Sequence, residues 1–477
     1  MRMDRRTFLS LVAIPAFAAL AGACGGDDDD AADTTSDDTG TSGSGETDTT
    51  GTTGTTATTG ADPTATTGAD STTTSVPGGG SEARSDLVRR QADPADAAVA
   101  SDAINRFAGD LYPKLAAAAP DANLVFSPAS IAIALAMTRA GAVGTTASEM
   151  DDVLHIADPA VIHGAMNALT AALESRTGSF PDGGGKPQDV TLAIANSVWA
   201  QAGVAFQQAF LDLLAGEYGA GLELTDFAAD PDAARVAINE WVNDETMERI
   251  PELLSPGSLD PLTRLVLVNA VYLKAPWLYP FIETGTTPGP CSLPDGSTVD
   301  VDLMTLDESL PYARGDGWQA VELPYVGDEL GLLVIVPDDD LAAVEASVPE
   351  GLLEDVASAL GAAHVQLRFP KFDIETSAEL GGMLAELGMP TPFNPGTADF
   401  SGMTTEEQLY ISAVVHQANI TVDEKGTEAA AATAVVMRAT SAPVEVVELV
   451  VDRPFVFALR DGGTGAVLFL GRITDPR

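Results

Sequence analysis

Apolar residues recur at intervals of three and four along the first part of the chain, which is the period of an amphipathic helix. Residues 97–119 form the longest such stretch. Its apolar face consists of Ile104, Phe107, Leu111 and Leu115. This spacing predicts a helix that packs one face against a core.

Two further helices follow from the same periodicity. Ser127 and Pro128 precede a helical stretch that ends at residue 140, and proline is favoured in the first turn of a helix. Residues 231–243 predict another helix, with Val236 and Trp241 expected to face the core.

Strand patterns dominate the later part of the chain. Residues 265–273 are almost uninterruptedly apolar, as expected for a strand that is buried on both faces. Six further strands are predicted at 320–323, 330–336, 364–369, 445–451, 455–459 and 466–470. Helices first and strands later predict an α+β fold with large, mostly antiparallel sheets.

One segment, residues 422–435, suits two conformations. Its sequence, VDEKGTEAAAATAV, contains many helix formers, whereas Gly426, Thr427 and the small and β-branched residues after them also suit a strand. A segment that is a loop in one state and a buried strand in another can store conformational energy.

The N-terminal residues 1–24 are interpreted as an export signal rather than as part of the fold. Arg5 and Arg6 precede an apolar run that ends in L-A-G-A-C at Cys24. The first motif resembles a twin-arginine signal and the second a bacterial lipoprotein cleavage site, which predicts lipidation of Cys24. Ala21 stands where leucine is usual, so an ordinary secretory signal or an uncleaved anchor remains an alternative.

Residues 25–85 are low in complexity and contain almost no large apolar side chain. Such a composition predicts a disordered tether, since too little apolar surface is available to offset the entropy of ordering. About 60 residues of this kind span roughly 40–45 Å. We therefore expect residues 86–477 to form one folded domain that is exported to the cell surface or beyond, and that meets a membrane only through the lipid anchor.

The formal net charge of −46 argues against nucleic acid, heparin-like polymers and anionic lipid as partners. Solubility, or life at high salt, is the simpler explanation of this acidity. Cys291 is expected to be a lone, inert thiol, because the only other cysteine lies in the signal. The four histidines are scattered without a Cys/His cluster, so no metal or cofactor is expected.

Six sequence strings, taken in order along the folded part, resemble those of the serpin family. The strings are NLVFSPASI from Asn123, LVNAVYLKAPW from Leu267, VELPY from Val321, ISAVVH from Ile411, DRPFVF from Asp452 and LFLGR from Leu468. Each string alone is weakly specific, but six in the family's order are highly specific. Leu273 and Ala275 depart from the usual phenylalanine and glycine, which leaves the expected fold in place.

The resemblance implies a fold of three β-sheets and about nine helices with an exposed reactive-centre loop. In this family a serine protease cuts the loop, which then inserts as a new strand in the largest sheet. A monomer without enzymatic activity is implied. The positions that match the family's shutter and breach, where the sheet opens, are Ser127, Ser130, Asn269, His416 and Trp277. The matching hinge positions are Glu424, Gly426, Thr427, Glu428, Ala429, Ala430, Ala431 and Ala432.

The family's spacing, fifteen residues counted from Gly426, ends at Thr440 and predicts cleavage between Thr440 and Ser441. Threonine at this position favours an elastase-like or subtilisin-like protease. Cleavage after Ala439 is an alternative, and cleavage after Arg438 would suit a trypsin-like enzyme.

Strand alternation is compatible with insertion of this loop. The positions that would face inward are Thr427, Ala429, Ala431, Thr433, Val435 and Met437, none of them charged. Glu428 and Arg438 would face solvent, and a one-residue slip would bury both charges.

Two other functions were weighed against protease inhibition. A non-inhibitory serpin-fold binding protein would be expected to carry bulky, charged or proline residues in the hinge, unlike Ala429–Ala432. A hydrolase would need a nucleophile elbow after a strand, which the folded part lacks, and His416 is expected to be buried.

Overall fold

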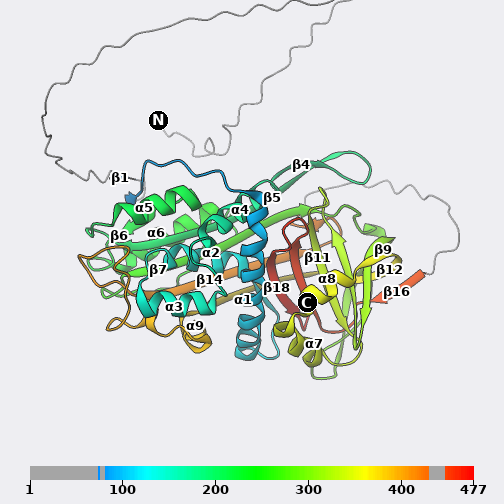
Figure 1. Cartoon of the computed structure of the whole chain (residues 1–477). Coiled ribbons are helices and arrows are strands. Elements are labelled where there is room, and N and C mark those ends of the chain that lie inside the picture. The colour runs from blue at the N-terminus through cyan, green and yellow to red at the C-terminus, as the bar shows by residue number, and fades with distance from the viewer. Residues whose placement is uncertain (1–72, 76–80, 429–445) are drawn as a thin grey trace, which may run out of the picture. The chain divides into compact units, whose positions relative to one another are not determined.

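The structure is a computed structural model that describes residues 73–75, 81–428 and 446–477. These residues form nine α-helices and two hydrogen-bonded networks of nine strands each (Figure 1). The architecture confirms the predicted α+β class. No helix in the described part is long and apolar enough to span a bilayer.

The first network is a large sheet whose long strands β5, β7 and β14 run side by side (Figure 1). In spatial order it contains β1 (Thr73–Ser75), β2 (Ser81–Ala83), β6 (Leu222–Thr225), β5 (Pro187–Gln201), β7 (Leu265–Pro276), β15 (Gly426–Thr427), β14 (Ile411–Val422) and β13 (Phe372–Glu379), with β4 (Gly178–Pro181) paired to β5. β5 and β7 are antiparallel, whereas β7 and β14 are parallel.

The second network is built around the long strand β9 (Thr298–Gly315). Its order is β16 (Val446–Val450), β12 (Gly361–Pro370), β9, β10 (Trp318–Pro324), β11 (Leu330–Pro337), β17 (Phe455–Asp461), β18 (Val467–Ile473) and β3 (Leu124–Phe126), with β8 (Thr287–Ser292) paired to β9. β9 pairs with β12 and β8 along its first part and with β10 near its end. The three sheets that the resemblance implies are thus the large sheet and the two halves of this network, which β9 joins.

The nine helices cover these sheets. They are α1 (Ala97–Ala118), α2 (Pro128–Arg139), α3 (Gly144–Val153), α4 (Ile162–Glu174), α5 (Gln208–Leu213), α6 (Pro231–Glu245), α7 (Leu341–Ser347), α8 (Leu352–Ala359) and α9 (Gly381–Leu387). α2 is buried along nearly its whole length and contacts β5, β7 and β18. Ser127 caps it by accepting a hydrogen bond from the backbone N–H of Ser130, and Pro128 occupies its first position.

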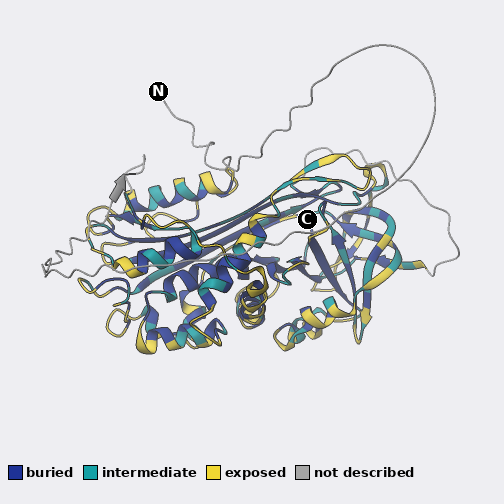
Figure 2. Ribbon diagram, turned by 45° about the horizontal axis from the view of Figure 1, so that its top comes forward, coloured by how far each residue is buried: buried dark blue, intermediate teal, exposed yellow. Residues whose placement is uncertain are grey.

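β7 is buried on both faces, as its unbroken apolar sequence predicts. Its even and odd positions face two different clusters: Leu265 and Leu267 belong to the main core, while Val266 and Val268 pack under α6. The strands of the large sheet are accordingly among the most buried parts of the molecule (Figure 2). A charge at residues 265–273 would therefore be unfavourable on either face, whereas Lys274 near the end of the strand is only half-buried.

The predicted orientation of α6 is wrong for Val236, which is 39% exposed. Trp241 does pack against the core, although it is only partly buried, and its ring lies edge-on to Trp199. The buried face consists instead of Ala234, Ile238 and Val242, because their spacing of four places them on one side of the helix.

Seven of the eighteen described strands were predicted, and β5, β9 and β2 are among those that were not. β5 and β9 lack a clean two-residue alternation, and β9 carries several acidic residues. β2 falls within the segment that composition assigned to the tether, and it pairs with β6 at the border of the large sheet.

Candidate functional site

The boundary between β7 and β14, here called the seam, is the place where the large sheet is least complete. The two strands pair in parallel from Leu265 and Ile411 to Ala270 and Gln417. Nearer the end of β7, the two-residue strand β15 lies between them and runs antiparallel to both, with Thr427 opposite Ala275 on one side and Val422 on the other. The chain that leads into the predicted reactive loop therefore already begins a new strand in the seam.

A tight turn carries the chain from β14 into β15. The Asp423 carboxylate accepts hydrogen bonds from the backbone N–H groups of Lys425 (2.8 Å) and Gly426 (3.2 Å). Gly426 has φ +154°, and a Cβ at this position would lie 2.2 Å from the carbonyl oxygen of Ala275. Only glycine lets the backbone approach β7 this closely.

Thr427 points into the protein, as the alternation predicted. It is buried, and its hydroxyl lies 2.6 Å from the hydroxyl of Tyr325. The Tyr325 ring stacks on Trp277 with ring centres 4.4 Å apart. Burial raises the pKa of Tyr325, so the phenol stays neutral and serves only as a hydrogen-bonding group.

Trp277 and Glu424 hold the turn from two sides. The Trp277 indole N–H donates to the carbonyl of Asp423 at 2.9 Å. The Glu424 carboxylate accepts from the Thr286 hydroxyl and pairs with the Lys371 ammonium, each at 2.6 Å. Burial acts to raise the pKa of Glu424, but the hydrogen bonds from Lys371 and Thr286 outweigh it and the pKa is lowered. The carboxylate is therefore ionised at neutral pH.

The shutter residues Ser127, Ser130, Asn269 and His416 are all buried, midway along the seam. The backbone N–H of Ser127 donates to Nε2 of His416 at 3.0 Å, which places the proton of the neutral ring on Nδ1. Burial lowers the pKa of His416 to about 3, so the ring is neutral at physiological pH. Asn269 on β7 lies opposite His416 on β14.

The predicted hydrogen-bonded cluster is only partly formed. Among the described residues, the side-chain amide of Asn269 is buried without a hydrogen-bond partner. The Ser130 hydroxyl does not bond to this amide and instead donates to Oδ1 of Asn196 on β5 at 2.7 Å. Since unpaired buried polar groups weaken a structure, the shutter is a poorly satisfied part of the sheet.

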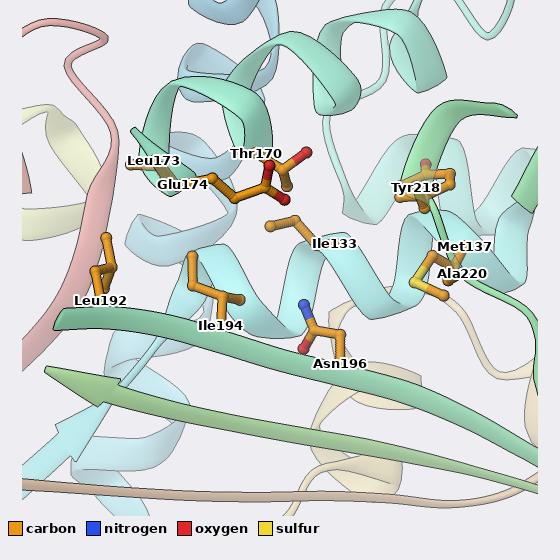
Figure 3. A pocket seen from close by; sticks show the side chains of 10 residues that line it. All are labelled: Ile133, Met137, Thr170, Leu173, Glu174, Leu192, Ile194, Asn196, Tyr218 and Ala220. Atoms are coloured by element: carbon orange, nitrogen blue, oxygen red, sulfur yellow. The ribbon is translucent and has the colours of Figure 1, made fainter. Parts of the chain in front are cut away.

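A cavity of about 120 Å³ lies beside the shutter, between α2, α4 and β5. In Figure 3, Asn196 points from β5 toward this space, with Ile133 of α2 facing it and Glu174 of α4 on the other side. The lining residues are Ile133, Met137, Thr170, Leu173, Glu174, Leu192, Ile194, Asn196, Tyr218 and Ala220. The packing of β5 against its helices is therefore incomplete next to the residue that binds Ser130.

The remaining predicted positions are placed as follows. Residues Ala429–Ala432, Arg438, Ala439, Thr440, Ser441 and Cys24 lie outside the described residues. Cys291 is buried, and burial raises the pKa of its thiol to about 11, which makes it a poor nucleophile. Among residues 81–428 and 446–477, no group of three His, Cys, Asp or Glu side chains could hold a metal ion.

Several residues of the site were missed by the sequence analysis. Asn196, Lys371 and Thr286 each bond to a predicted residue but come from other parts of the chain. Tyr325 was quoted within the VELPY string, but only the structure shows that it bonds to Thr427. Nothing in the local pattern around these residues indicates such distant partners.

Comparison with known proteins gives a consistent result. Residues 102–476 match the family described as Serpin (serine protease inhibitor). The chain is 38% identical over 381 residues to a serpin-like protein of Thermococcus kodakarensis, an alignment that covers 79% of this chain and 85% of that protein. It is 35% identical over 387 residues to leukocyte elastase inhibitor A of Rattus norvegicus, an alignment that covers 79% of this chain and 99% of that protein.

Solved structures share the fold. The native state of the thermophilic serpin tengpin matches with a TM-score of 0.70 at 25% identity, over 82% of this chain and 96% of that chain. Serpin48 of Tenebrio molitor matches with a TM-score of 0.68 at 31% identity, over 79% and 98%. The family match covers most of the chain. The chain therefore belongs to the serpin family.

Proposed function

We propose that this protein inhibits serine proteases as a suicide substrate and is not itself an enzyme. The protease cuts the reactive-centre loop, which then continues β15 along the seam as a full strand. The position of β15 carries the proposal, because both of its residues already pair with β7 and Thr427 also pairs with β14. The similarity to leukocyte elastase inhibitors supports a protease as the partner.

The energetic argument rests on strand direction. An inserted strand replaces the parallel β7–β14 pairs by antiparallel pairs on both of its sides, and antiparallel pairing is slightly more stable per residue. Filling the seam down to Leu265 would add roughly a dozen backbone hydrogen bonds worth about 1 kcal/mol each, before the entropy of ordering the loop. The uncut protein is then metastable and is held by a kinetic barrier.

The target and the setting follow from the sequence. Cleavage after Thr440 or Ala439 by an elastase-like or subtilisin-like enzyme is preferred to cleavage after Arg438 by a trypsin-like enzyme. Export through the signal at residues 1–24 and a lipid anchor on Cys24 would place a monomeric inhibitor at the cell surface, on a long tether.

The experiment uses the full chain and a panel of elastase-like, subtilisin-like and trypsin-like proteases. The expected results are an SDS-stable complex with one of them, a C-terminal fragment whose mass gives the cut bond, and a melting temperature that rises by tens of degrees in the cut protein. Cleavage without a complex, but with the rise in melting temperature, would favour a non-inhibitory serpin-fold binding protein. Cleavage that leaves the melting temperature unchanged would refute insertion.

A further inference from the structure

The chain leaves the sheet at Glu428, and its backbone conformation there is unusual. Glu428 has φ +51°, in the left-handed region that residues with a Cβ seldom adopt. Thr427, directly before it, is already paired as part of β15. Since a strand requires extended dihedrals, β15 cannot lengthen beyond Thr427 until Glu428 changes conformation.

The Glu428 carboxylate is held by Arg249 and by Tyr272 of β7, and Arg249 links it to β14. Arg249 pairs with it and also donates a hydrogen bond to the Thr421 hydroxyl of β14 at 3.0 Å. Tyr272 of β7 hydrogen-bonds to the same carboxylate, and burial together with that carboxylate raises the pKa of Tyr272 to about 12. The Thr421 hydroxyl in turn donates to Asp373 of β13 at 2.7 Å. We call Arg249, Tyr272, Thr421 and Glu428 the clasp.

The segment that presents Arg249 is itself strained. Met247 and Glu248, directly before it, have φ +53° and +65°, so two successive residues with a Cβ are left-handed. Thr246 and Ile250 anchor this segment on either side: the Thr246 hydroxyl donates to Val242 at 2.8 Å and accepts from the N–H of Ile250 at 3.1 Å. Strain of this kind persists only where the surroundings impose it, and it gathers at functional sites.

We propose that Arg249 is a positioning residue that restrains the uncut loop. By holding the Glu428 carboxylate across the seam, it keeps Glu428 in the left-handed turn and stops the loop from extending β15 before a protease has cut it. This inference rests on the proposed insertion mechanism and adds the contact that delays insertion. Removing the clasp lets Glu428 relax to extended dihedrals, so the uncut chain reaches the loop-inserted form faster.

The test follows the conversion of uncut, full-length protein a few degrees below its melting temperature. Mass spectrometry confirms that the loop is intact, and the fraction that has gained a higher melting temperature is measured over time. Arg249→Gln and Glu428→Gln, which break the same pair from either side, should each convert about tenfold faster than the unchanged protein, equivalent to a barrier lowered by about 1.4 kcal/mol. Arg249→Lys should convert at a rate between those of the unchanged protein and Arg249→Gln, since one ammonium replaces the hydrogen bonds of the guanidinium only in part.

Two controls separate positioning from a general loss of stability. Arg235 of α6 forms ion pairs with Asp232 and Glu252 and none with the clasp. Arg235→Gln should therefore leave the conversion rate unchanged. The double variant Arg249→Glu with Glu428→Arg restores an opposite-charge pair and should recover most of the slow rate.

Three outcomes would overturn the proposal. The first is that Arg249→Gln and Glu428→Gln lower the melting temperature without faster conversion. The second is that Arg235→Gln accelerates conversion equally, and the third is that the charge-reversed double variant fails to recover the slow rate. In each case the unchanged protein would still gain stability when cut, so the insertion mechanism would stand. If the cut unchanged protein gains no stability, the insertion mechanism fails and the clasp fails with it.

Discussion

At the hinge end of the seam the buried polar side chains are paired, whereas in the shutter the Asn269 amide is not. Thr427 bonds to Tyr325, and Glu424 bonds to both Lys371 and Thr286. Halfway along the same seam, the Asn269 side-chain amide has no partner among the described residues. Both regions lie on the same strands, so one sheet contains a well hydrogen-bonded region and a poorly hydrogen-bonded one.

The difference between the hinge and the shutter indicates which of them contributes more to the stability of the uncut protein. In the proposed mechanism the hinge fixes the start of the inserted strand. Disturbing it should lower stability, because each lost hydrogen bond leaves a buried partner unpaired. The buried amide in the shutter adds no side-chain hydrogen bond to the uninserted state. Separating β7 from β14 there therefore breaks no hydrogen bond of that amide. A sheet that opens to accept a strand needs both properties, a defined starting point and a weak interior.

The largest effect is expected from Gly426→Ala. The added Cβ would lie 2.2 Å from the Ala275 carbonyl oxygen, so β15 must withdraw from the seam or β7 must shift. Overpacking together with an unfavourable φ should cost about 3 kcal/mol or more, measured as the free energy of unfolding of the uncut protein in urea.

Gly203→Ala is the matched control for this change. Gly203 also has a positive φ, of +88°, but a Cβ there would meet no atom within 4 Å. Its substitution should cost about 1 kcal/mol from backbone strain alone. Equal losses in the two variants would mean that the close approach of Gly426 to β7 contributes nothing.

The next effect is expected from Thr427→Val, which keeps the shape of the side chain but leaves the Tyr325 hydroxyl buried without its partner. This should lower the free energy of unfolding by about 2 kcal/mol. Tyr325→Phe should lower it by a similar amount. The double variant should lose clearly less than the sum, because no unpaired group remains. Additive losses in this double-mutant cycle would show that the two hydroxyls do not interact.

Sequence patterns predicted much of the fold, but the reach of each pattern was local. Periodicity located α1 and the buried strand β7, since a helix face or an unbroken apolar run is visible within a dozen residues. The prediction for Val236 of α6 was wrong because Val236 and Ile238 are both apolar, and the sequence alone does not show which of them faces the core. Packing against β5 and β7 buries Ile238 and leaves Val236 exposed.

The candidate site was predicted only as far as the family's strings reach. They marked Trp277, Asn269 and His416, which the structure places along one seam. Asn196 and Arg249 could not be found in this way, because their roles depend on partners that lie 66 and 179 positions away. Long-range pairing of this kind is a property of the folded sheet and leaves no trace in local composition.

A change of opposite sign is expected in the shutter. Asn269→Leu replaces a buried amide that lacks partners by an apolar side chain of similar size, and should stabilise the uncut protein by about 1 kcal/mol. Unfolding in urea measures this change.

The matched control is Asn239→Leu on α6. The Asn239 amide donates to Leu254 at 2.9 Å and accepts from the N–H groups of Leu253 and Leu254. Losing these bonds should cost about 2 kcal/mol or more. Destabilisation of similar size in both variants would contradict the idea that the shutter is poorly satisfied.

The last expected effect is on the pH dependence of stability. Burial lowers the pKa of His416 to about 3 and that of His163 on α4 to about 4. The unfolded chain, in which both have a pKa of about 6.5, then binds more protons than the folded chain, so stability falls as pH drops below about 6.5. Each histidine should contribute a loss of about 1 kcal/mol between pH 7 and pH 5.5.

His416→Gln and His163→Gln should therefore each remove about half of this pH dependence, measured by urea unfolding at pH 7 and pH 5.5. The rate of loop insertion separates them. His416 lies at the seam and receives the Ser127 N–H, which a protonated ring cannot accept, so acid should speed insertion in His163→Gln. It should do so far less in His416→Gln, whose amide oxygen can accept that bond at any pH. Equal acid acceleration in both variants would show that the shutter histidine has no special part in opening the sheet.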